Sequence, residues 1–410
     1  MKDLLFLAHR IPYPPNKGDK IRSYHILRYL AERFRVHLGA FVDDSHDWRY
    51  ADRLQAWCAE TCLLPLNPRR SRLRSLSGLI AGEALSLPYY RDAALARWVD
   101  GLCSRHDISH VFVFSSPMAQ YVLDRRFATA RRVIDFVDVD SDKWRQYAQS
   151  KPWPLSWVYR REAERLAAFE CRAAQVADVS LFVSAREAGL FRELCPDVGR
   201  VDHFDNGVDW RYFSPIPESD NPYAEHSRPI VFTGAMDYWA NVDAVSWFAR
   251  EVFPRIRELQ PFAEFVIVGS RPGDEVRRLE KQPGVRVTGS VEDVRPYLEH
   301  AYLSVAPLRI ARGVQNKVLE AMAMAKPVVA TRAALDGIHY PVGQDLRLAE
   351  EPADMAREIL GLLERRTAAP TARDWVRRRY DWNLNLQRLM AVLDPPAGGR
   401  PRACLEEDEG

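Results

Sequence analysis

Residues 309–329 combine two arginines, a glycine and a single carboxylate within one predicted loop and helix. Arg309 and Arg312 follow an apolar run typical of a strand, and Gly313 allows the backbone to approach a ligand closely. The next run, Lys317–Ala325, is strongly helix-forming. Because the start of a helix exposes unpaired N–H groups and the positive end of its dipole, this arrangement suits a diphosphate.

Glu320 falls in the first turn or so of the predicted helix. Its carboxylate could accept hydrogen bonds from the hydroxyl groups of a ribose. The alternative is a capped core helix, because Leu319, Met322 and Ala323 are ordinary packing residues. The local sequence leaves both interpretations open, so the surrounding elements have to decide between them.

Composition limits the classes of protein that could carry such a site. A chain of 410 residues suggests two domains, and 47% apolar with 28% charged residues is typical of a soluble globular protein. The formal net charge of +2 gives no indication of nucleic acid as a partner, and we expect none. No apolar run reaches the length of about 18 residues that a transmembrane helix needs. Residues 1–10 are typical of a first strand and not of a signal peptide.

The cysteines are scattered along the chain and show no CxxC spacing. This distribution predicts reduced thiols in a cytosolic protein and argues against disulfides or a zinc site. The cysteines are Cys58, Cys62, Cys103, Cys171, Cys195 and Cys404.

The first half of the chain alternates short apolar runs with amphipathic stretches. Continuous apolar runs are expected where helices cover both faces of a parallel sheet, so the fold class is predicted to be α/β. Helices are predicted over Lys20–Phe34 and Leu155–Val176. The expected strands are Leu4–Ala8, Val36–Val42, Cys62–Leu66, His110–Ser115, Arg132–Val139 and Val179–Ser184.

A proline-rich break at residues 213–228 is a linker by composition, and the alternating pattern then restarts. We therefore expect two Rossmann-like domains, residues 1–212 and 229–371, with ligands bound where the carboxyl ends of their strands face across a cleft. Residues 372–394 are expected to form a helix that packs back on the first domain, and residues 395–410 a disordered tail. The strands expected in the second domain are Pro229–Thr233, Phe265–Gly269, Val285–Thr288, Leu303–Ala306 and Pro327–Thr331.

Six passages carry a resemblance to a known family: His9–His25, Asp135–Trp144, Asn206–Asp209, Phe213–Pro215, Phe232–Asp243 and Gly313–Val329. In these passages the chain resembles the retaining glycosyltransferases of the GT-B fold, specifically glycosyltransferase family four. Within that family it is similar to the sugar transferases of exosortase-associated (PEP-CTERM) exopolysaccharide loci in bacteria. The resemblance runs through about the first 390 residues and implies a GT-B fold of two Rossmann-like domains. It also implies a nucleotide-sugar as donor substrate, with no metal or other cofactor.

The resemblance implies that the nucleotide lies on the second domain, with Glu320 on its ribose hydroxyls. Arg312 and Lys317 are then expected to hold the diphosphate and to act catalytically. Fixed donors at this position stabilise the negative charge that grows on the leaving phosphate as the glycosidic bond breaks. The other residues predicted to bind the donor are Gly18, Gly234, Arg309, Gly313, Val314, Gln315 and Asn316.

Two positions depart from the family pattern. Family four usually has two glutamates spaced Glu-x7-Glu, but Arg312 occupies the position of the first one, eight residues before Glu320. Contacts with the donor sugar must therefore differ. The family also often places Arg and Lys after the first strand of the second domain, whereas residues 235–241 contain no cation. We expect Arg309, Arg312 and Lys317 to supply that positive charge, since an arginine fork matches phosphate oxygens well.

The loop after the first predicted strand supplies the candidates for the acceptor side. His9 ends that strand, and Lys17, Asp19 and Arg22 flank Gly18. The resemblance places such a glycine close to the donor diphosphate and the acceptor. A turn glycine in a proline-rich loop, and a histidine with a structural role, are the alternatives at these positions.

Asp138 and Asp140 form an Asp-Val-Asp string, which is the pattern that binds a metal–nucleotide complex in the other major glycosyltransferase fold. Alternate residues of a strand share a face, so both carboxylates could reach one cation. The donor motif of the second domain nevertheless implies a metal-independent site. We expect a direct hydrogen bond from Asp138 to the sugar, and therefore place it among the catalytic residues.

Residues 69–80 interleave arginines with Leu73, Leu76, Leu79 and Ile80 at helical spacing. Such a helix could lie on an anionic membrane surface, with Trp153 and Trp157 as further anchors. The alternative is a solvated helix whose apolar side faces the core. The sequence leaves both open.

The function that these features predict is transfer of a sugar from a nucleotide-sugar to a glycan acceptor, with polyprenyl diphosphate as the expected carrier, in exopolysaccharide biosynthesis. The protein is expected in the cytoplasm, peripherally on the inner face of the cytoplasmic membrane. Two rival functions remain: a nucleotide-sugar epimerase of the same fold, and an inactive scaffold in a polysaccharide assembly complex. The sequence does not identify the base, the sugar, the acceptor or the linkage.

Overall fold

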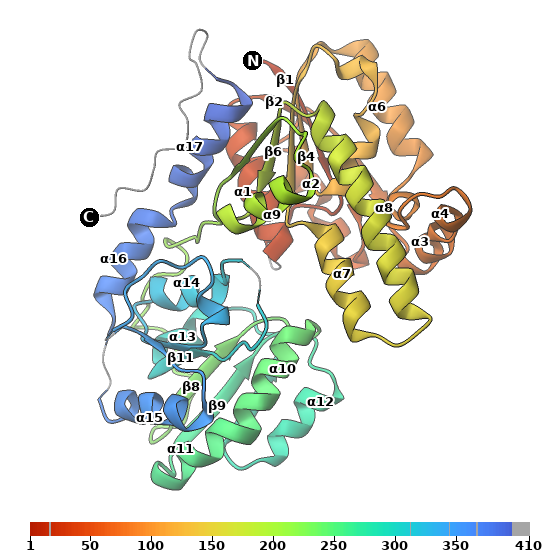
Figure 1. The fold of residues 1–410 in the computed structure, drawn as a ribbon. Coiled ribbons are helices and arrows are strands. Elements are labelled where there is room, and N and C mark those ends of the chain that lie inside the picture. Colours follow the sequence, from red (N-terminus) through yellow and green to blue (C-terminus); the bar gives the residue numbers. More distant parts are fainter. Residues whose placement is uncertain (16–17, 312, 344, 366–367, 396–410) are drawn as a thin grey trace. The chain divides into compact units, whose positions relative to one another are not determined.

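The computed structural model describes residues 1–15, 18–311, 313–343, 345–365 and 368–395. Lys17, Arg312 and the expected tail beyond residue 395 lie outside the described residues. The chain divides into two compact units (Figure 1). Each unit has its own apolar core. Unit 1 contains Met1–Phe204 together with the chain from Asn385 onward, and unit 2 contains Asp205–Leu384.

Unit 1 is built on a parallel seven-stranded sheet in the order β3-β2-β1-β4-β5-β6-β7. β1 pairs with β2 on one side and with β4 on the other, so the strand order reverses beside β1. Open α/β sheets bind ligands at such a switch point, beyond the carboxyl ends of the strands. The strands are β1 (Asp3–Ala8), β2 (Arg35–Val42), β3 (Glu60–Pro65), β4 (Ile108–Phe114), β5 (Arg131–Val137), β6 (Val179–Phe182) and β7 (Arg200–His203).

Helices cover both faces of this sheet, which is why its central strands are almost entirely apolar (Figure 1). The longest of the described helices in unit 1 is α8, at 22 residues. The helices are α1 (Gly18–Ala31), α2 (Ala51–Gln55), α3 (Pro68–Ser75), α4 (Ser77–Ile80), α5 (Ser86–Tyr89), α6 (Ala93–Arg105), α7 (Asp140–Ser150), α8 (Leu155–Val176) and α9 (Ala185–Leu194).

Unit 2 repeats the plan with a parallel six-stranded sheet in the order β10-β9-β8-β11-β12-β13, and its switch point lies between β8 and β11. Its strands are β8 (Arg228–Thr233), β9 (Ala263–Val268), β10 (Val285–Gly289), β11 (Leu303–Ala306), β12 (Val328–Ala330) and β13 (Leu346–Leu348). Its helices are α10 (Trp239–Trp247), α11 (Phe253–Leu259), α12 (Asp274–Arg277), α13 (Arg295–His300), α14 (Asn316–Ala323), α15 (Pro352–Leu363) and α16 (Pro370–Arg379).

The helix predicted over residues 372–394 is in fact two helices, α16 and α17 (Trp382–Leu393). Tyr380 and Asp381 interrupt it because both are held by the rest of unit 2. The Tyr380 hydroxyl donates to the Gly337 carbonyl at 2.8 Å, and the Trp210 indole donates to the Asp381 carboxylate at 2.6 Å. From Asn385 onward, α17 belongs to unit 1.

A further expectation from sequence, that the cysteines are reduced thiols, is corrected by the structure. Cys171 and Cys195 form a disulfide, because α8 and the end of α9 bring their Cα atoms to 5.6 Å, within the usual range. The thiols of Cys58, Cys62 and Cys103 are free, as expected. The structure also decides between the two alternatives for residues 69–80. The apolar side of α3 and α4 does not face the core, because the exposed residues include Leu73, Leu76, Leu79 and Ile80. No helix in the described part of the chain combines the length and apolarity needed to cross a bilayer.

Candidate functional site

The carboxyl edge of the unit 2 sheet carries the residues that the sequence singles out. The chain leaves β8 through Gly234 and enters α10, and it leaves the neighbouring β11 through a loop that leads into α14. Both connections therefore meet at the switch point of the sheet, where a ligand is expected. The fold places the loop before α14 beside the turn after β8, although some 80 residues separate them in the sequence.

Glycine is required where β8 ends. Gly234 has a φ of 155°, and a Cβ atom added there would lie 2.8 Å from the Asn241 Nδ2 and 3.4 Å from the Lys317 Nζ. A Cβ on Gly269, which follows β9, would lie 1.7 Å from the Gly234 carbonyl oxygen. Gly234 was predicted from the sequence, whereas Gly269 was not. Together the two glycines let the turn after β8 pack against the neighbouring loop and against Lys317.

Lys317 is the cation that reaches this turn. Its ammonium donates to the Asn241 Oδ1 at 2.5 Å and lies 4.5 Å from the centre of the Phe232 ring. Burial lowers the pKa of Lys317 to about 7, although the nearby Glu320 carboxylate opposes the shift. Burial also raises the pKa of Glu320 to about 7, against the effect of Lys317. An anionic ligand here would favour the charged form of the lysine.

The start of α14 leaves polar groups available to a ligand. Gly313 has a φ of 61°. Gln315 occupies the N-cap position of α14, but its side chain makes no capping hydrogen bond to the helix. The Gln315 amide donates instead to the Gly313 carbonyl at 3.0 Å, while the apolar Val314 is buried. The buried Asn316 Oδ1 has no hydrogen-bond partner among the described residues. A buried acceptor without a donor is unfavourable, so a ligand hydroxyl or water suits this position.

Arg309 is already paired. Its guanidinium donates through Nε to the Asp243 Oδ2 at 3.0 Å and through a second nitrogen to the other carboxylate oxygen. Asp243 lies on α10, so this fork joins the loop before α14 to that helix. Because the Arg309 guanidinium is already paired with a carboxylate, Lys317 is the better placed of the two cations to bind a diphosphate. Arg312, the third expected cation, lies outside the described residues.

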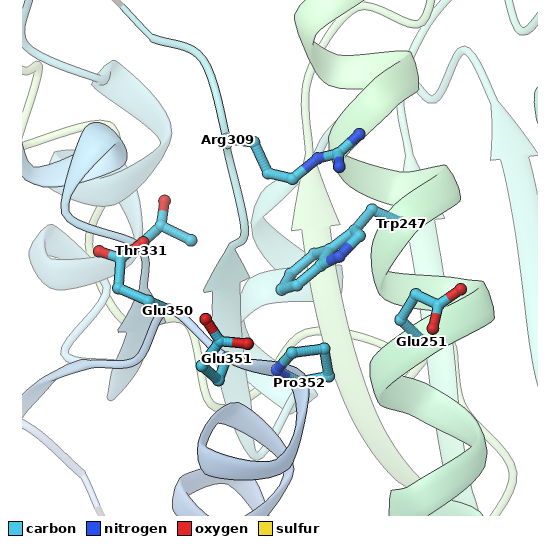
Figure 2. Close-up of a pocket in the computed structure, with 7 residues that line it drawn as sticks. All are labelled: Trp247, Glu251, Arg309, Thr331, Glu350, Glu351 and Pro352. Carbon is cyan, nitrogen blue, oxygen red and sulfur yellow. The ribbon is translucent and has the colours of Figure 1, made fainter.

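A cavity of about 560 Å³ lies beside Arg309 at the carboxyl ends of β11, β12 and β13 (Figure 2). In Figure 2 the ring of Trp247 projects between Arg309 and the segment that begins α15. Three carboxylates in its lining make this cavity a poor match for a diphosphate, so we place the candidate site at Lys317 instead. Its lining consists of Trp247, Glu251, Arg309, Thr331, Glu350, Glu351 and Pro352.

In unit 1, His9 and Asp19 lie together at the carboxyl end of β1. The His9 Nε2 is 3.4 Å from an Asp19 carboxylate oxygen, and Arg10, which the sequence interpretation missed, donates to the same oxygen at 2.6 Å. Arg10 also contacts Asp43 at 3.0 Å. Although burial opposes it, the contacts with His9 and Arg10 hold the pKa of Asp19 well below its usual range. Gly18 begins α1, and no atom lies within 4 Å of the position its Cβ would take.

Arg22 does not reach the surface, although it was predicted on the acceptor side. It is fully buried, and its guanidinium forks onto the buried Asp135 at 2.8 and 3.3 Å. The guanidinium also donates to the Phe204 carbonyl at 3.0 Å and stacks on the aromatic ring of Phe204. Asp135 in turn accepts the N–H of Val137, whose φ is 70°. The pair therefore shapes the turn that presents Asp138, which is a positioning role.

Asp138 and Asp140 do converge on one cation, but it is the ammonium of Lys143. That group lies 2.7 Å from an Asp138 oxygen and 3.1 Å from an Asp140 oxygen. β5 ends at Val137, so the two carboxylates meet through a turn into α7 and not along a strand. Burial opposes the charge on Lys143, but the two carboxylates raise its pKa. Lys143 thus occupies the position that a metal ion would take between them.

Glu170 is a buried carboxyl beside these loops that the sequence interpretation did not identify. It lies on α8 next to the hydroxyls of Ser116, after β4, and Ser141, at the start of α7. Burial, and then the charge of Asp140, raise the pKa of Glu170 to about 8. Its carboxyl is therefore mostly neutral at pH 7.

The amino edge of the same sheet carries the one histidine and carboxylate cluster that could hold a metal among the described residues. The His37 Nε2 is 2.6 Å from an Asp3 oxygen, and the His106 Nε2 is 2.6 Å from a Glu60 oxygen. The guanidinium of Arg35 lies 3.5 Å from Asp3. With a cation already present and each imidazole on a carboxylate, we interpret the cluster as an ion-pair network at the edge opposite the candidate site.

Comparison with known proteins agrees with this geometry. Residues 227–365, which span the unit 2 sheet and its candidate site, match the family described as Glycosyl transferases group 1. Unit 2 therefore carries a domain of the group 1 glycosyltransferase type. No curated protein sequence matches the chain.

Solved structures resemble the whole chain in fold. Sucrose-phosphate synthase from Thermosynechococcus elongatus has a TM-score of 0.70 at 15% identity, over 96% of this chain and 98% of that one. Anabaena HepE in complex with UDP has a TM-score of 0.63 at 15% identity, over 96% and 99%. Trehalose 6-phosphate synthase from Burkholderia multivorans has a TM-score of 0.61 at 12% identity, over 96% and 98%. With the two parallel sheets, these matches confirm the predicted GT-B fold.

Proposed function

We propose that this protein is a retaining, metal-independent glycosyltransferase of family four, similar to the exosortase-associated subgroup. It moves a sugar from a nucleotide-sugar to a glycan carried on polyprenyl diphosphate, in bacterial exopolysaccharide biosynthesis at the inner face of the cytoplasmic membrane. The observation that carries the proposal is the start of α14 at the unit 2 switch point, inside the segment that matches group 1 glycosyltransferases. Lys317 lies there beside Gly234, and Glu320 follows on the same helix. Anabaena HepE, which shares the fold, was solved with UDP and with UDP-glucose.

In the proposed donor site, a few residues bind the diphosphate and the ribose. The N–H groups at the start of α14 and the Lys317 ammonium bind the diphosphate, and Glu320 accepts hydrogen bonds from the ribose. As the glycosidic bond breaks, charge on the leaving phosphate is stabilised by donors that are already in place. Removing one such donor typically costs about 2.7–4 kcal/mol of transition-state stabilisation. The leaving phosphate can itself take the proton of the acceptor hydroxyl, so no strong protein base is required.

On unit 1 the proposed acceptor candidates are His9 and Asp19 at the end of β1. Asp138, held by Lys143, is proposed to hydrogen-bond to the transferred sugar. The ion pair with Lys143 fixes the orientation of the carboxylate, which is an advantage for a group that has to position a sugar.

The test is a panel of nucleoside diphosphates and nucleotide-sugars, measured by thermal shift and calorimetry. One base is expected to raise the melting temperature and to bind. Lys317→Met should lose most of that binding, and Glu320→Ala should lose the preference for ribose over deoxyribose. The matched control is Lys281→Met, an exposed lysine at the end of a short helix elsewhere in unit 2.

Product analysis separates the rival functions. Transfer of the sugar to a lipid-linked acceptor supports the proposal, whereas release of a free, epimerised monosaccharide would identify a nucleotide-sugar epimerase. If no nucleoside diphosphate binds to the wild-type protein, the enzyme proposal fails and the scaffold remains.

A further inference from the structure

The helices α3 and α4 have an inverted arrangement of side chains. Ser71, Ser75 and Gly78 are buried. Leu73 and Ile80, by contrast, are 71% and 94% exposed. A surface helix of a soluble protein normally turns its apolar stripe to the core. This one turns its small and polar residues inward and its large apolar residues to solvent, which is a feature of interaction surfaces.

Polar contacts fix this orientation. The guanidinium of Arg74 donates to the Pro88 carbonyl at 2.7 Å and to the Tyr89 carbonyl at 2.8 Å, which ties α3 to α5. The Ser75 hydroxyl bonds back to the Ser71 carbonyl at 2.9 Å. Rotating the helix to bury its leucines would break the Arg74 contacts. The exposure of the leucines is therefore a consequence of how the helix is anchored.

A second group of exposed apolar residues lies at the start of α8. Trp153 and Trp157 are 80% and 53% exposed. Arg161, one helical turn (about 5.4 Å) after Trp157, donates to the Gly78 carbonyl in α4 at 2.8 Å. Figure 1 shows α3 and α4 beside α8. The two groups therefore lie on neighbouring segments of unit 1. Together they are called the apolar patch, which consists of Leu73, Leu76, Leu79, Ile80, Trp153, Leu155 and Trp157.

The two segments that carry the apolar patch hold charge of one sign. Residues 66–82 contain four arginines and no Asp or Glu, and residues 151–161 contain one lysine and two arginines and no Asp or Glu. Arg69, Arg70 and Arg72 are exposed. Two copies of such a surface would repel each other if they met face to face. An apolar patch inside an excess of positive charge instead complements anionic lipid, where tryptophan prefers the interface.

We propose that the apolar patch and its arginines dock unit 1 on an anionic lipid bilayer. The leucines and tryptophans enter the interfacial region, and the arginines lie at the level of the lipid phosphates. The inference deepens the proposed function, because it supplies a surface that could bring a lipid-linked acceptor to the protein. The biological role of the docking rests on the proposed function, but the binding of the patch to a bilayer does not depend on catalysis.

The position of the patch in unit 1 is suited to this role. α3 follows directly after the carboxyl end of β3. α8 leads into the amino end of β6, so its start lies toward the carboxyl edge of the sheet. The same edge carries His9 and Asp19 at the end of β1. A bilayer bound by the patch would therefore lie on the side of unit 1 that holds the acceptor candidates.

The experiment is flotation of the full chain with vesicles of phosphatidylcholine alone or mixed with phosphatidylglycerol. Binding is expected only to the mixed vesicles and should weaken with added salt. The triple variant Arg69→Gln, Arg70→Gln, Arg72→Gln should bind on the order of 100-fold more weakly, given about one kcal/mol per charge near the surface. The triple variant Leu73→Ser, Leu76→Ser, Ile80→Ser should lose binding.

The control variant carries Leu259→Ser and Phe262→Ser, which alter residues of unit 2 that are 71% and 61% exposed. It should bind vesicles as the wild type does. All variants should keep the wild-type melting temperature and nucleoside diphosphate binding, so a loss of docking is not a loss of fold or of the donor site.

Two results would overturn the inference. One is equal vesicle binding by the wild type and both patch variants. In the other, the wild type does not bind anionic vesicles and is dimeric by ultracentrifugation, whereas the variant with Leu73, Leu76 and Ile80 changed to serine is monomeric. The second result would make the patch a protein interface and would leave the donor-site proposal intact.

Discussion

The surroundings of Lys317 disfavour the charged form of its side chain. It is partly buried, its ammonium donates to a neutral amide, and the nearest carboxyl, Glu320, is itself desolvated. Burial lowers its pKa to about 7, so the charged and neutral forms have comparable populations near neutral pH. A diphosphate favours the charged form. Ligand binding and protonation of Lys317 should therefore be linked.

The first prediction follows from that linkage. The affinity for a nucleoside diphosphate should fall as pH rises from about 7.5 to about 9, by up to about tenfold per pH unit, because the neutral lysine must take up a proton to bind. Calorimetry in buffers of different ionisation enthalpy would measure that proton uptake. Lys317→Met should bind weakly and without this pH dependence, whereas Glu320→Gln should keep it. An affinity that stays constant over this range in the wild type would contradict the role of Lys317.

The second prediction concerns Gly234. In Gly234→Ala the new Cβ would lie 2.8 Å from the Asn241 amide, which has to move and take the Lys317 contact with it. We expect a loss of stability of about 1–3 kcal/mol and a marked loss of nucleotide binding. Urea unfolding and calorimetry measure the two effects. Gly273→Ala is the control, since its Cβ would meet no atom within 4 Å. Equal behaviour of the two variants would contradict the close packing at the switch point.

The sequence brings together Lys317 and Glu320 of the proposed donor site, but not the residues that contact them. Lys317 and Glu320 lie three residues apart on one helix, so local pattern was enough to bring them together. Asn241 and Lys143 could not be found in this way. Asn241 reaches Lys317 only through the pairing of β8 with β11, and Lys143 looked like an ordinary helix residue until α7 turned it toward Asp138. Arg22 shows the opposite error, because its place beside Gly18 gave no sign that its guanidinium is buried.

Elements with a continuous apolar pattern were the most predictable. β1 and β11 are almost wholly buried, so their composition alone marks them as central strands. β7 and β13, which have four and three residues, lie at the sheet edges with one buried residue each, and they were missed. The orientation of α3 was also beyond the sequence. Its leucine spacing is compatible with a buried or an exposed stripe, and the contacts of Arg74 with α5 hold it with the leucines exposed.

The buried pair of Arg22 and Asp135 joins α1 to β5, and it provides the third prediction. Asp135→Asn leaves a buried guanidinium without its counter-charge, so stability should fall by about 3–5 kcal/mol. Glu83→Gln removes a similar fork, with Arg91 at 2.8 Å, but in an exposed position. It should cost about 1 kcal/mol or less. Urea unfolding of the two variants checks the comparison. A small effect of Asp135→Asn would show that the pair does not hold the turn before Asp138.

At the scale of the whole molecule, the chain forms most of unit 1, then unit 2, and then adds α17 to unit 1. Several polar contacts hold α17 and the residues after it on unit 1. The Lys2 ammonium contacts Asp394 at 2.7 Å, and Arg131 donates to the Val392 carbonyl at 3.0 Å. The apolar side of α17 is buried at Leu389, whereas Leu384, in the first turn, is 47% exposed. Unit 1 therefore depends on residues that the chain supplies last.

This dependence can be tested within one helix. Leu389→Ala should reduce stability by about 2–5 kcal/mol, because it opens a cavity beneath α17, while Leu384→Ala should change it by less than about 0.5 kcal/mol. In hydrogen exchange the loss should appear in β1, β4 and β5 of unit 1 and spare β8 and β11. Nucleoside diphosphate affinity should stay at the wild-type value in both variants, because every residue of the proposed donor site on α14 and after β8 belongs to unit 2. If Leu389→Ala instead weakened nucleotide binding while leaving the exchange of unit 1 unchanged, α17 would have to support the proposed donor site and not unit 1.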